Sequence, residues 1–213
     1  MLRELAFAAA FLVAAIGGAA NFWGHERSYY AGVVTSLRLD RAAFHFPGGD
    51  RAVPLSAIFA VDDETRRFVL DAAPIGALMR EFFDANELAH LEDVRRVFGG
   101  VLTAAIAASV IAILAGVGLA PRRIRRAMLV DAAIVVVVGA VAAVAFEPLF
   151  LAFHELFFPQ GNFLFDPTRE NLTLIYPEEY WLGVTLRLGV TVIAACLIVG
   201  GLVSLRIRSN ARA

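Results

Sequence analysis

The sequence predicts a mainly α-helical membrane protein built on a bundle of four transmembrane helices. Three observations support this fold class. The 213 residues are 59% hydrophobic and 18% charged, whereas soluble domains carry about 45–50% apolar and about 25% charged residues. Four apolar stretches reach the length of about 20 residues that a helix needs to cross roughly 30 Å of hydrocarbon. Arginines without acidic neighbours cluster in the segment after the second stretch and in the C-terminal tail, a distribution typical of multi-pass membrane proteins.

The four predicted spans belong to one integral membrane domain that covers residues 1–213. The first span also resembles a signal peptide, because Arg3 precedes an apolar run that ends in small residues. Its apolar run is longer than that of a usual signal peptide, so we interpret it as a membrane span. The spans are expected at about 5–23, 99–120, 128–153 and 182–205.

Arginine placement predicts the orientation of the spans. The segment PRRIRRA after the second span and the tail RIRSNARA contain arginines and no acid, and segments rich in Lys and Arg face the cytoplasm. Both termini are therefore expected on the cytoplasmic side of the cell membrane. The segments 24–98 and 154–181 are then extracytoplasmic.

The first outer segment, 24–98, divides into two parts by its pattern. The short β-type runs VVTSLRL, AFHF and AIFAV, with the turn signal PGGD at 47–50, predict a small β-meander from about 33 to 61. The remainder predicts a helix that continues into the second span, because apolar residues recur near a 3.6-residue period. Asp84 and Glu87 resemble a capping box before it.

The second outer segment, 154–181, returns the chain to the membrane surface. It is rich in Phe, Tyr and Trp, which favour the membrane–water interface, and PQGN and DPTREN are turn signals. We therefore expect an aromatic interfacial loop between the third and fourth spans.

Two of the four histidines stand out by their position. His90 and His154 each lie next to a predicted span and on the same outer side, whereas His25 and His45 have a structural interpretation. His90 shares a helix face with Asp93 and Val97. Two ionisable groups at one interfacial site are typical of acid–base catalysis.

Other chemistries find little support in the sequence. The net charge of −1 indicates no nucleic-acid partner. His154 and Glu155 do not belong to an HExxH motif, and the single cysteine, Cys196, cannot form a disulfide within the chain or a cysteine-based zinc site. The GxSxG, P-loop and dinucleotide motifs are absent. We expect neither a metal nor a cofactor.

Two stretches together resemble a known family. FHELFFPQGNFLFDP, followed by LTLIYPEEYW, is similar to the extracytoplasmic motif of the lipoprotein intramolecular transacylase family (Lit), which comprises small four-span bacterial membrane proteins. AHLEDVRRVF resembles the family's second motif, a His followed three residues later by Asp-Val-Arg or Asp-Val-Lys. Phe163 stands where the family pattern has tryptophan, and 33–61 matches nothing in the family.

The resemblance implies an activity and its catalytic residues. Members of the family move the sn-2 acyl chain of a diacylglyceryl-modified lipoprotein onto the α-amine of its N-terminal cysteine, which yields a lyso-form lipoprotein. The expected partners are thus the lipoprotein and membrane lipid. The motif positions make His90 and His154 the catalytic candidates, without showing which is base and which is acid.

Further motif residues are expected to support the site. Asp93 or Glu155 is expected to fix a histidine tautomer, and Arg95 or Arg169 to stabilise an oxyanion. The other residues expected to bind substrate or support the site are Phe157, Phe158, Gly161, Asn162, Asp166 and Tyr176. The alternative function is a non-enzymatic membrane scaffold or sensor with an extracytoplasmic binding segment. The oligomeric state stays open.

Overall fold

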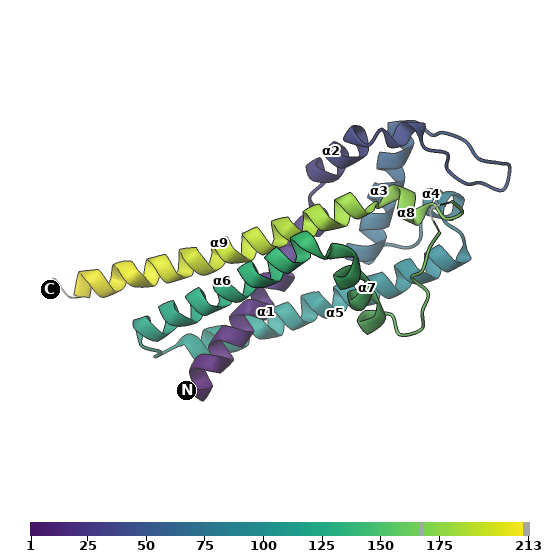
Figure 1. Cartoon of the computed structure of the whole chain (residues 1–213). Helices are drawn as coiled ribbons and strands as arrows, with labels where there is room; N and C mark the ends of the chain where they lie inside the picture. The colour runs from purple at the N-terminus through teal and green to yellow at the C-terminus, as the bar shows by residue number, and fades with distance from the viewer. Residues whose placement is uncertain (167, 211–213) are drawn as a thin grey trace. The chain divides into compact units, whose positions relative to one another are not determined.

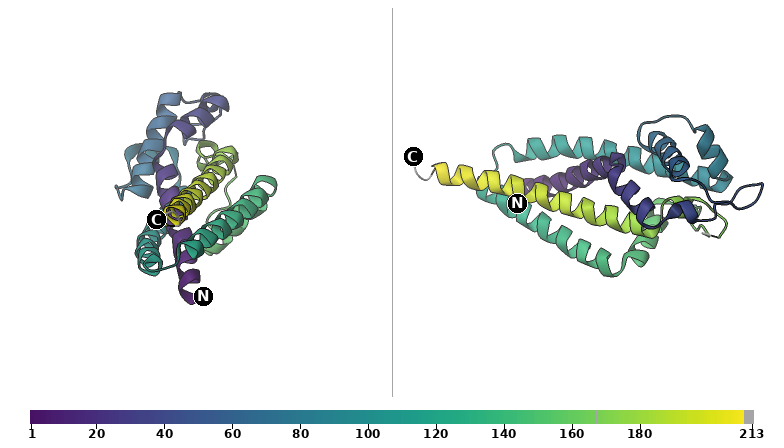
Figure 2. Two further views of the ribbon diagram at one scale, coloured as in Figure 1. Left: turned by 90° about the vertical axis from the view of Figure 1, so that its left-hand side faces the viewer. Right: turned by 90° about the horizontal axis from the view of Figure 1, so that it is seen from above.

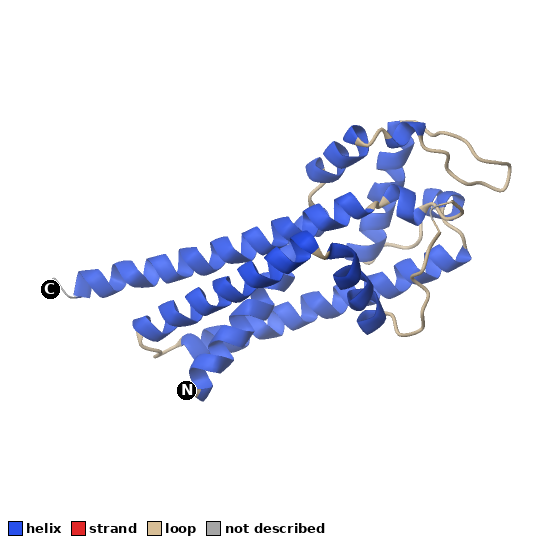
Figure 3. Ribbon diagram, viewed as in Figure 1, coloured by secondary structure: helices blue, strands red, loops and turns tan. Residues whose placement is uncertain are grey.

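The computed structural model describes residues 1–166 and 168–210, and its regular elements in that range are all helices (Figures 1 and 3). Figure 2 shows the same elements from two other sides. In chain order they are α1 (Leu2–His25), α2 (Ser28–Ser36), the 3-10 turn η1 (Leu39–Arg41), α3 (Leu55–Leu70), α4 (Ala77–Phe82), α5 (Ala85–Gly116), α6 (Pro121–Val144), α7 (Phe146–Phe157), α8 (Leu172–Ile175) and α9 (Glu178–Asn210).

Four of these helices are long and apolar enough to cross a membrane: α1, α5, α6 and α9. Their large apolar side chains are exposed along much of their length, for example Ile113 at 67% and Val137 at 62%. Such exposure suits a lipid environment, because lipid tails solvate apolar side chains. The mainly helical class predicted from the sequence is confirmed, and the number of candidate membrane helices equals the four spans predicted.

The chain divides into two compact units, and the first contains the apolar parts of the four long helices, from 1–23, 100–146 and 184–210. Small residues let these helices approach closely. A Cβ added at Gly17 of α1 would lie 2.5 Å from the Cβ of Ala105 in α5. The core of this unit combines such small residues with a few larger ones: Phe7, Ala10, Ala19, Ala108, Ala112, Ala127, Met128, Ala132, Val192 and Cys196. Small-residue packing of this kind is common between membrane helices.

The second unit comprises 24–99 and 147–183, the two segments predicted to lie outside the membrane together with the residues next to them. Helix α3 packs on α4 and on α2 within it. Its core contains large side chains that are almost fully buried: Tyr30, Phe44, Ile58, Phe68, Met79, Phe158 and Ile175.

The predicted β-meander at 33–61 is wrong. Helix α2 covers its beginning and α3 its end, and the only β-pairing among the described residues is one isolated bridge between Phe44 and Arg51. The PGGD turn closes this bridge, with Gly49 at a φ of +108°.

A helical period explains the error. The buried residues Ile58, Val61, Thr65 and Phe68 recur at helical spacing, and the run AIFAV is the first part of that pattern. Short apolar runs fit a strand and a buried helix equally well.

The predicted third span, 128–153, also differs from the structure. It is divided at Ala145 into α6 and α7. Pro148 explains the division, because a proline ring collides with the carbonyl four residues earlier in a helix, here that of Val144, the last residue of α6. His154 therefore lies on a separate helix, α7, and not on the membrane-spanning helix α6.

Candidate active site

The two histidines singled out by the sequence meet in the second unit. The imidazole rings of His90 on α5 and His154 on α7 lie with centroids 5.9 Å apart and planes 18° from parallel. Two imidazoles at this separation can both reach one small substrate headgroup, because each needs only hydrogen-bond contact with its own reacting atom.

His90 is buried but lies outside the apolar part of its helix. Its residue is 6% exposed, and four charged residues, Glu92, Asp93, Arg95 and Arg96, separate it from the membrane-spanning residues of α5. Its Nδ1 atom is buried without a hydrogen-bond partner among the described residues. The pKa of His90 is lowered to about 4, first by burial and second by the neighbouring His154, whereas Asp93 and the backbone of Asn162 act in the opposite direction.

A hydrogen bond within α7 fixes the tautomer of His154. Its Nδ1 lies 2.7 Å from the carbonyl oxygen of Phe150. A carbonyl can only accept, so Nδ1 carries the proton in the neutral ring and Nε2 has the free lone pair. Burial lowers the pKa of His154, and the bond to Phe150 partly offsets this shift. Both rings are therefore neutral near pH 7.

Phenylalanine rings enclose the histidine pair. The Phe158 ring lies 4.8 Å from that of His90 and 5.3 Å from that of His154. Phe165 is 5.3 Å from His90, and Phe163 is 5.3 Å from His154. These apolar neighbours supply the burial that disfavours the protonated imidazoles.

Asp93 contacts the loop after α7 rather than a histidine nitrogen. Its Oδ2 accepts hydrogen bonds from Gln160 Nε2 at 2.7 Å and Asn162 Nδ2 at 2.8 Å, while its Oδ1 accepts from Arg96 at 2.7 Å. Glu155 is exposed. The acceptor that sets the His154 tautomer is thus the Phe150 carbonyl, which helical geometry places one turn away, and not either of the predicted carboxylates.

Of the two predicted oxyanion arginines, Arg95 is engaged elsewhere and Arg169 is exposed. Arg95 donates to the carbonyls of Ala72 and Ala73, each at 3.2 Å, and lies over the Phe68 ring at 4.9 Å. Arg95 follows His90 by five positions, so the two side chains project from different sides of α5. Arg169 is exposed, and its charge contributes to lowering the pKa of Asp166.

The remaining predicted support residues shape the loop and its surroundings. Gly161 has a φ of +81°, which favours glycine at this turn. Asp166 Oδ1 accepts from the backbone N and the hydroxyl of Thr168, which makes a local turn. Phe157 is 43% exposed, whereas Phe158 is buried.

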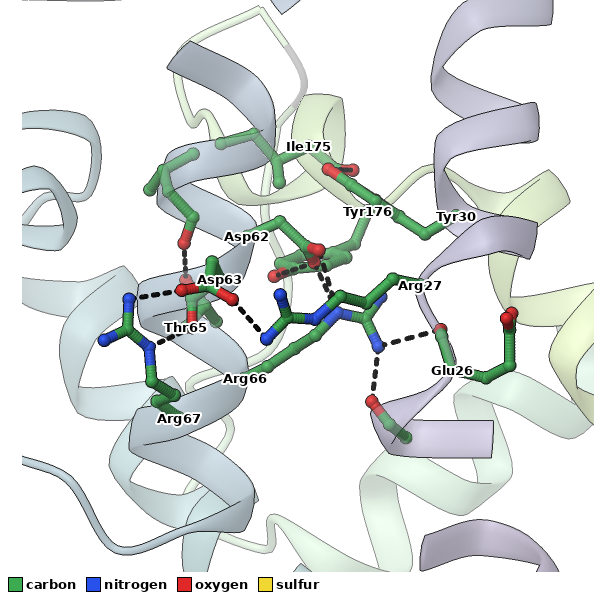
Figure 4. A network of polar contacts seen from close by, with 12 residues as sticks. Glu26, Arg27, Tyr30, Asp62, Asp63, Thr65, Arg66, Arg67, Ile175 and Tyr176 are labelled. Carbon is green, nitrogen blue, oxygen red and sulfur yellow. Dashed lines mark hydrogen bonds and ion pairs between the residues drawn. The ribbon is translucent and has the colours of Figure 1, made fainter. Parts of the chain in front are cut away.

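Tyr176 belongs to a buried polar network that the sequence analysis missed (Figure 4). Its hydroxyl donates to Asp62 Oδ1 at 3.0 Å. Arg66 Nε lies 2.8 Å from Asp62 Oδ2, and Arg66 NH2 reaches the Tyr180 hydroxyl at 3.3 Å. Both charged residues lie on the buried face of α3. The only signal in the sequence was their i, i+4 spacing.

Trp181 connects this network to the helix of His154. Its ring centroid lies 6.1 Å from that of Tyr176 and 6.1 Å from that of Phe150. The network therefore supports the residue whose carbonyl orients His154.

Glu87 and Asn171 form a second buried polar group that was not predicted to belong to the site. Glu87 Oε2 accepts from Asp84 N at 2.7 Å and Oε1 from Leu172 N at 2.6 Å. Its two N–H partners suit the ionised carboxylate, although burial raises its pKa to about 7. Asn171 bonds to the backbone N and O of His45, each at 2.8 Å, and to the Phe82 carbonyl.

The other two histidines pair with carboxylates away from the site. His25 lies 3.1 Å from Asp71 and His45 lies 2.9 Å from Asp50. These contacts agree with the structural interpretation of both.

Comparisons with known proteins identify the family. The family model "Lipoprotein intramolecular transacylase Lit" matches residues 60–181, more than half of the chain. No curated protein sequence matches the chain significantly.

Solved structures share the fold. The structure of the membrane integral lipoprotein intramolecular transacylase Lit from Bacillus cereus has a TM-score of 0.81 at 17% identity, covering 100% of this chain and 97% of that one. Two variants of the same protein, in which a histidine is replaced by alanine or by arginine, have TM-scores of 0.79 and 0.78 at 16% identity, covering 100% and 99% of this chain and 95% and 93% of theirs.

The family match covers both histidine-bearing motifs and all the residues between them. This chain therefore belongs to the Lit family of lipoprotein intramolecular transacylases, which are integral membrane enzymes.

Proposed function

We propose that this enzyme transfers the sn-2 acyl chain of a diacylglyceryl lipoprotein to the α-amine of its N-terminal cysteine, by proton transfers through His90 and His154. The observation that carries this proposal is the stacked pair of imidazoles, of which His90 is buried and His154 half-buried, with ring centroids 5.9 Å apart. Acyl donor and acceptor belong to one substrate, so folding the lipid headgroup back on itself exploits proximity.

The proton balance of the reaction explains why two imidazoles are useful. An α-amine has a pKa near 8 and enters mostly as an ammonium ion. When this ammonium nitrogen becomes an amide nitrogen, it loses two protons. The departing glyceryl oxygen gains one of them, and the second is released to water. One imidazole can pass a proton to the glyceryl oxygen while the second accepts the proton that is released.

The geometry favours His154 as the base for the attacking amine. The Phe150 carbonyl holds its Nδ1–H at 2.7 Å, leaves Nε2 free to accept, and stabilises the imidazolium that forms. His90 is then the proton donor to the glyceryl oxygen. Because His90 is neutral near pH 7, it first takes up one of the two protons that the substrate ammonium loses, while His154 accepts the other and releases it to water. Protonated His90 is a strong acid, since burial disfavours its charged form, and it returns its proton to the departing glyceryl oxygen.

The arginine distribution supports an extracytoplasmic position for this site, with both termini in the cytoplasm. The segment 121–126 has four arginines and no acid. The aromatic residues of 153–181 favour headgroup depth, where acyl ester groups lie. Membership of an enzyme family weighs against the alternative of a non-enzymatic scaffold or sensor.

Alanine variants test this function. His90→Ala and His154→Ala are each expected to lower formation of the N-acyl product by at least about 100-fold, since acid–base catalysis contributes about 10²–10⁴. Mass spectrometry of a reporter lipoprotein measures the product. His25→Ala is the matched control, because His25 contacts Asp71 at an exposed position. Near-normal product from either of the first two variants would refute the proposed mechanism.

A further inference from the structure

The loop between α7 and α8 contacts the histidine pair, and its described residues contain turns but no helix or strand. We call residues 158–166 and 168–171 the aromatic loop. Phe158, Phe163 and Phe165 of this loop contact the two imidazoles. A segment without internal hydrogen-bond ladders needs external attachments to keep three rings in place.

One attachment holds the start of the aromatic loop to α5. Asp93 Oδ2 accepts from the side chains of Gln160 and Asn162, at 2.7 and 2.8 Å. The second oxygen of Asp93 is bound to Arg96 at 2.7 Å, which keeps the carboxylate from rotating. The side chain of Asp93 is 19% exposed, so these charge-assisted bonds are partly protected from water.

A second attachment holds the residue directly after the aromatic loop to the same helix. Glu87 Oε1 accepts from the backbone N of Leu172 at 2.6 Å, and the Glu87 residue is 2% exposed. Its other oxygen accepts from Asp84 N at 2.7 Å. Both oxygens are thus occupied by N–H donors, an arrangement that a glutamine side chain cannot reproduce because it has one acceptor oxygen.

Both attachments lie next to His90 in the helix. Glu87 precedes His90 by three residues and Asp93 follows it by three, so each is about one turn away. We propose that Glu87 and Asp93 are positioning residues that clamp the two ends of the aromatic loop to α5 and thereby close the loop over His90 and His154. This proposal rests on the proposed function of the two histidines.

The clamp has a defined role in the reaction. It keeps water from the imidazoles and holds the phenylalanine rings as walls for the substrate. The loss of one hydrogen bond to a charged group shifts the equilibrium between the bonded and the open state by about ten- to hundred-fold. Opening of the aromatic loop should become more frequent by that factor when one attachment is removed.

The first test measures the loop directly. Deuterium exchange at the amides of the aromatic loop is expected to accelerate by about ten- to hundred-fold in Glu87→Gln and in Asp93→Asn. Glu92→Gln is the matched control for Asp93: it removes the same charge from the adjacent residue, which contacts Arg96 at 3.9 Å and leaves Gln160 and Asn162 bound. Unchanged exchange in both clamp variants would overturn the proposal and leave the histidine mechanism intact.

The second test separates positioning from general stability. Glu87 is not among the groups whose charge shifts the pKa of His90, and removing any nearby negative charge would lower that pKa. If Glu87→Gln lets water reach His90, its pKa should instead rise from about 4 toward 6.5 in an NMR titration. Asp84→Asn, which keeps an acceptor oxygen for the helix cap, is the control. A His90 pKa that stays unchanged or falls would contradict the clamp.

The third test connects the clamp to turnover. With the reporter lipoprotein, both clamp variants are expected to lose about ten- to hundred-fold in kcat with a smaller change in KM, while Glu92→Gln retains normal activity. Faster exchange of the aromatic loop with unchanged kcat would overturn its catalytic role. The double variant His90→Ala with Glu87→Gln should lose no more activity than His90→Ala alone if both act through the same imidazole.

Discussion

The low pKa of His90 leads to a prediction that can be worked out from the structure. The fall from 6.5 to about 4 corresponds to about 3 kcal/mol in favour of the neutral ring. Burial is the main cause, and the adjacent His154 is the second. We therefore propose a pH titration of His90 in the unaltered chain and in His154→Gln. This variant removes the second imidazole, whose positive charge would repel protonated His90, and leaves His90 buried.

Labelled histidine side chains make this titration visible by NMR in detergent micelles. We expect His90 to titrate well below 6.5 in the unaltered chain. In His154→Gln its pKa should rise but remain below 6.5, because burial by Phe158 and Phe165 persists. A His90 that titrates at or above 6.5 in the unaltered chain would refute the reasoning.

The same shift predicts how stability depends on pH. Unfolded His90 binds a proton near 6.5, and folded His90 binds it only near 4. Between these values the unfolded state binds more protons, so the contribution of His90 to stability is full above pH 6.5 and decreases as pH falls toward 4. Thermal unfolding of His90→Gln should show a weaker decrease across this range, and equal slopes in the two proteins would contradict the assignment.

Three further variants test the packing of the two units through the midpoint of thermal unfolding in detergent: one in the second unit and two in the first. Asp62→Asn leaves Arg66 buried without its charged partner and breaks an ion pair whose side chains are only 5% and 8% exposed. We expect the free energy of unfolding to fall by about 3–5 kcal/mol. An unchanged midpoint would contradict this. Gly17→Ala should lower the midpoint, because the added Cβ would lie 2.5 Å from the Cβ of Ala105. A Cβ added at Gly18 has no neighbour within 4 Å. The midpoint of Gly18→Ala should therefore match or exceed that of the unaltered chain, since Ala is more favourable than Gly in a helix by about 1 kcal/mol. Equal effects of the two alanines would show that the close approach is unimportant.

Charged residues in the sequence predicted how the spans are oriented in the membrane, but in the outer unit they did not indicate which side chains are exposed. The segment 57–70 contains Asp62, Asp63, Glu64, Arg66 and Arg67, a composition typical of a solvated surface. In the structure Asp62 and Arg66 are buried and bond to one another. Whether a charge is buried depends on the partners that surround it, and here Tyr176 and Tyr180 come from a distant part of the chain.

The support roles assigned from the family motifs show the same limit. The sequence placed Asp93 on the face of His90, which is a local property of a helix. Its bonds to Gln160 and Asn162, and the turn of Arg95 toward Ala72 and Ala73, depend on which loops pack beside α5. The partner of His154 proved to be a carbonyl in its own helix, a contact that a search for carboxylates overlooks.

Apolar length and motif spacing are properties of contiguous residues, so the sequence was enough to predict four membrane spans, the family and two candidate catalytic histidines. The helices at 28–36 and 55–70, the division of the third span before Pro148 and the bond from Leu172 to Glu87 became visible only in the folded chain. Burial and hydrogen-bond partners come from residues far apart in the chain, and short apolar runs acquire a definite conformation only when they pack against such residues.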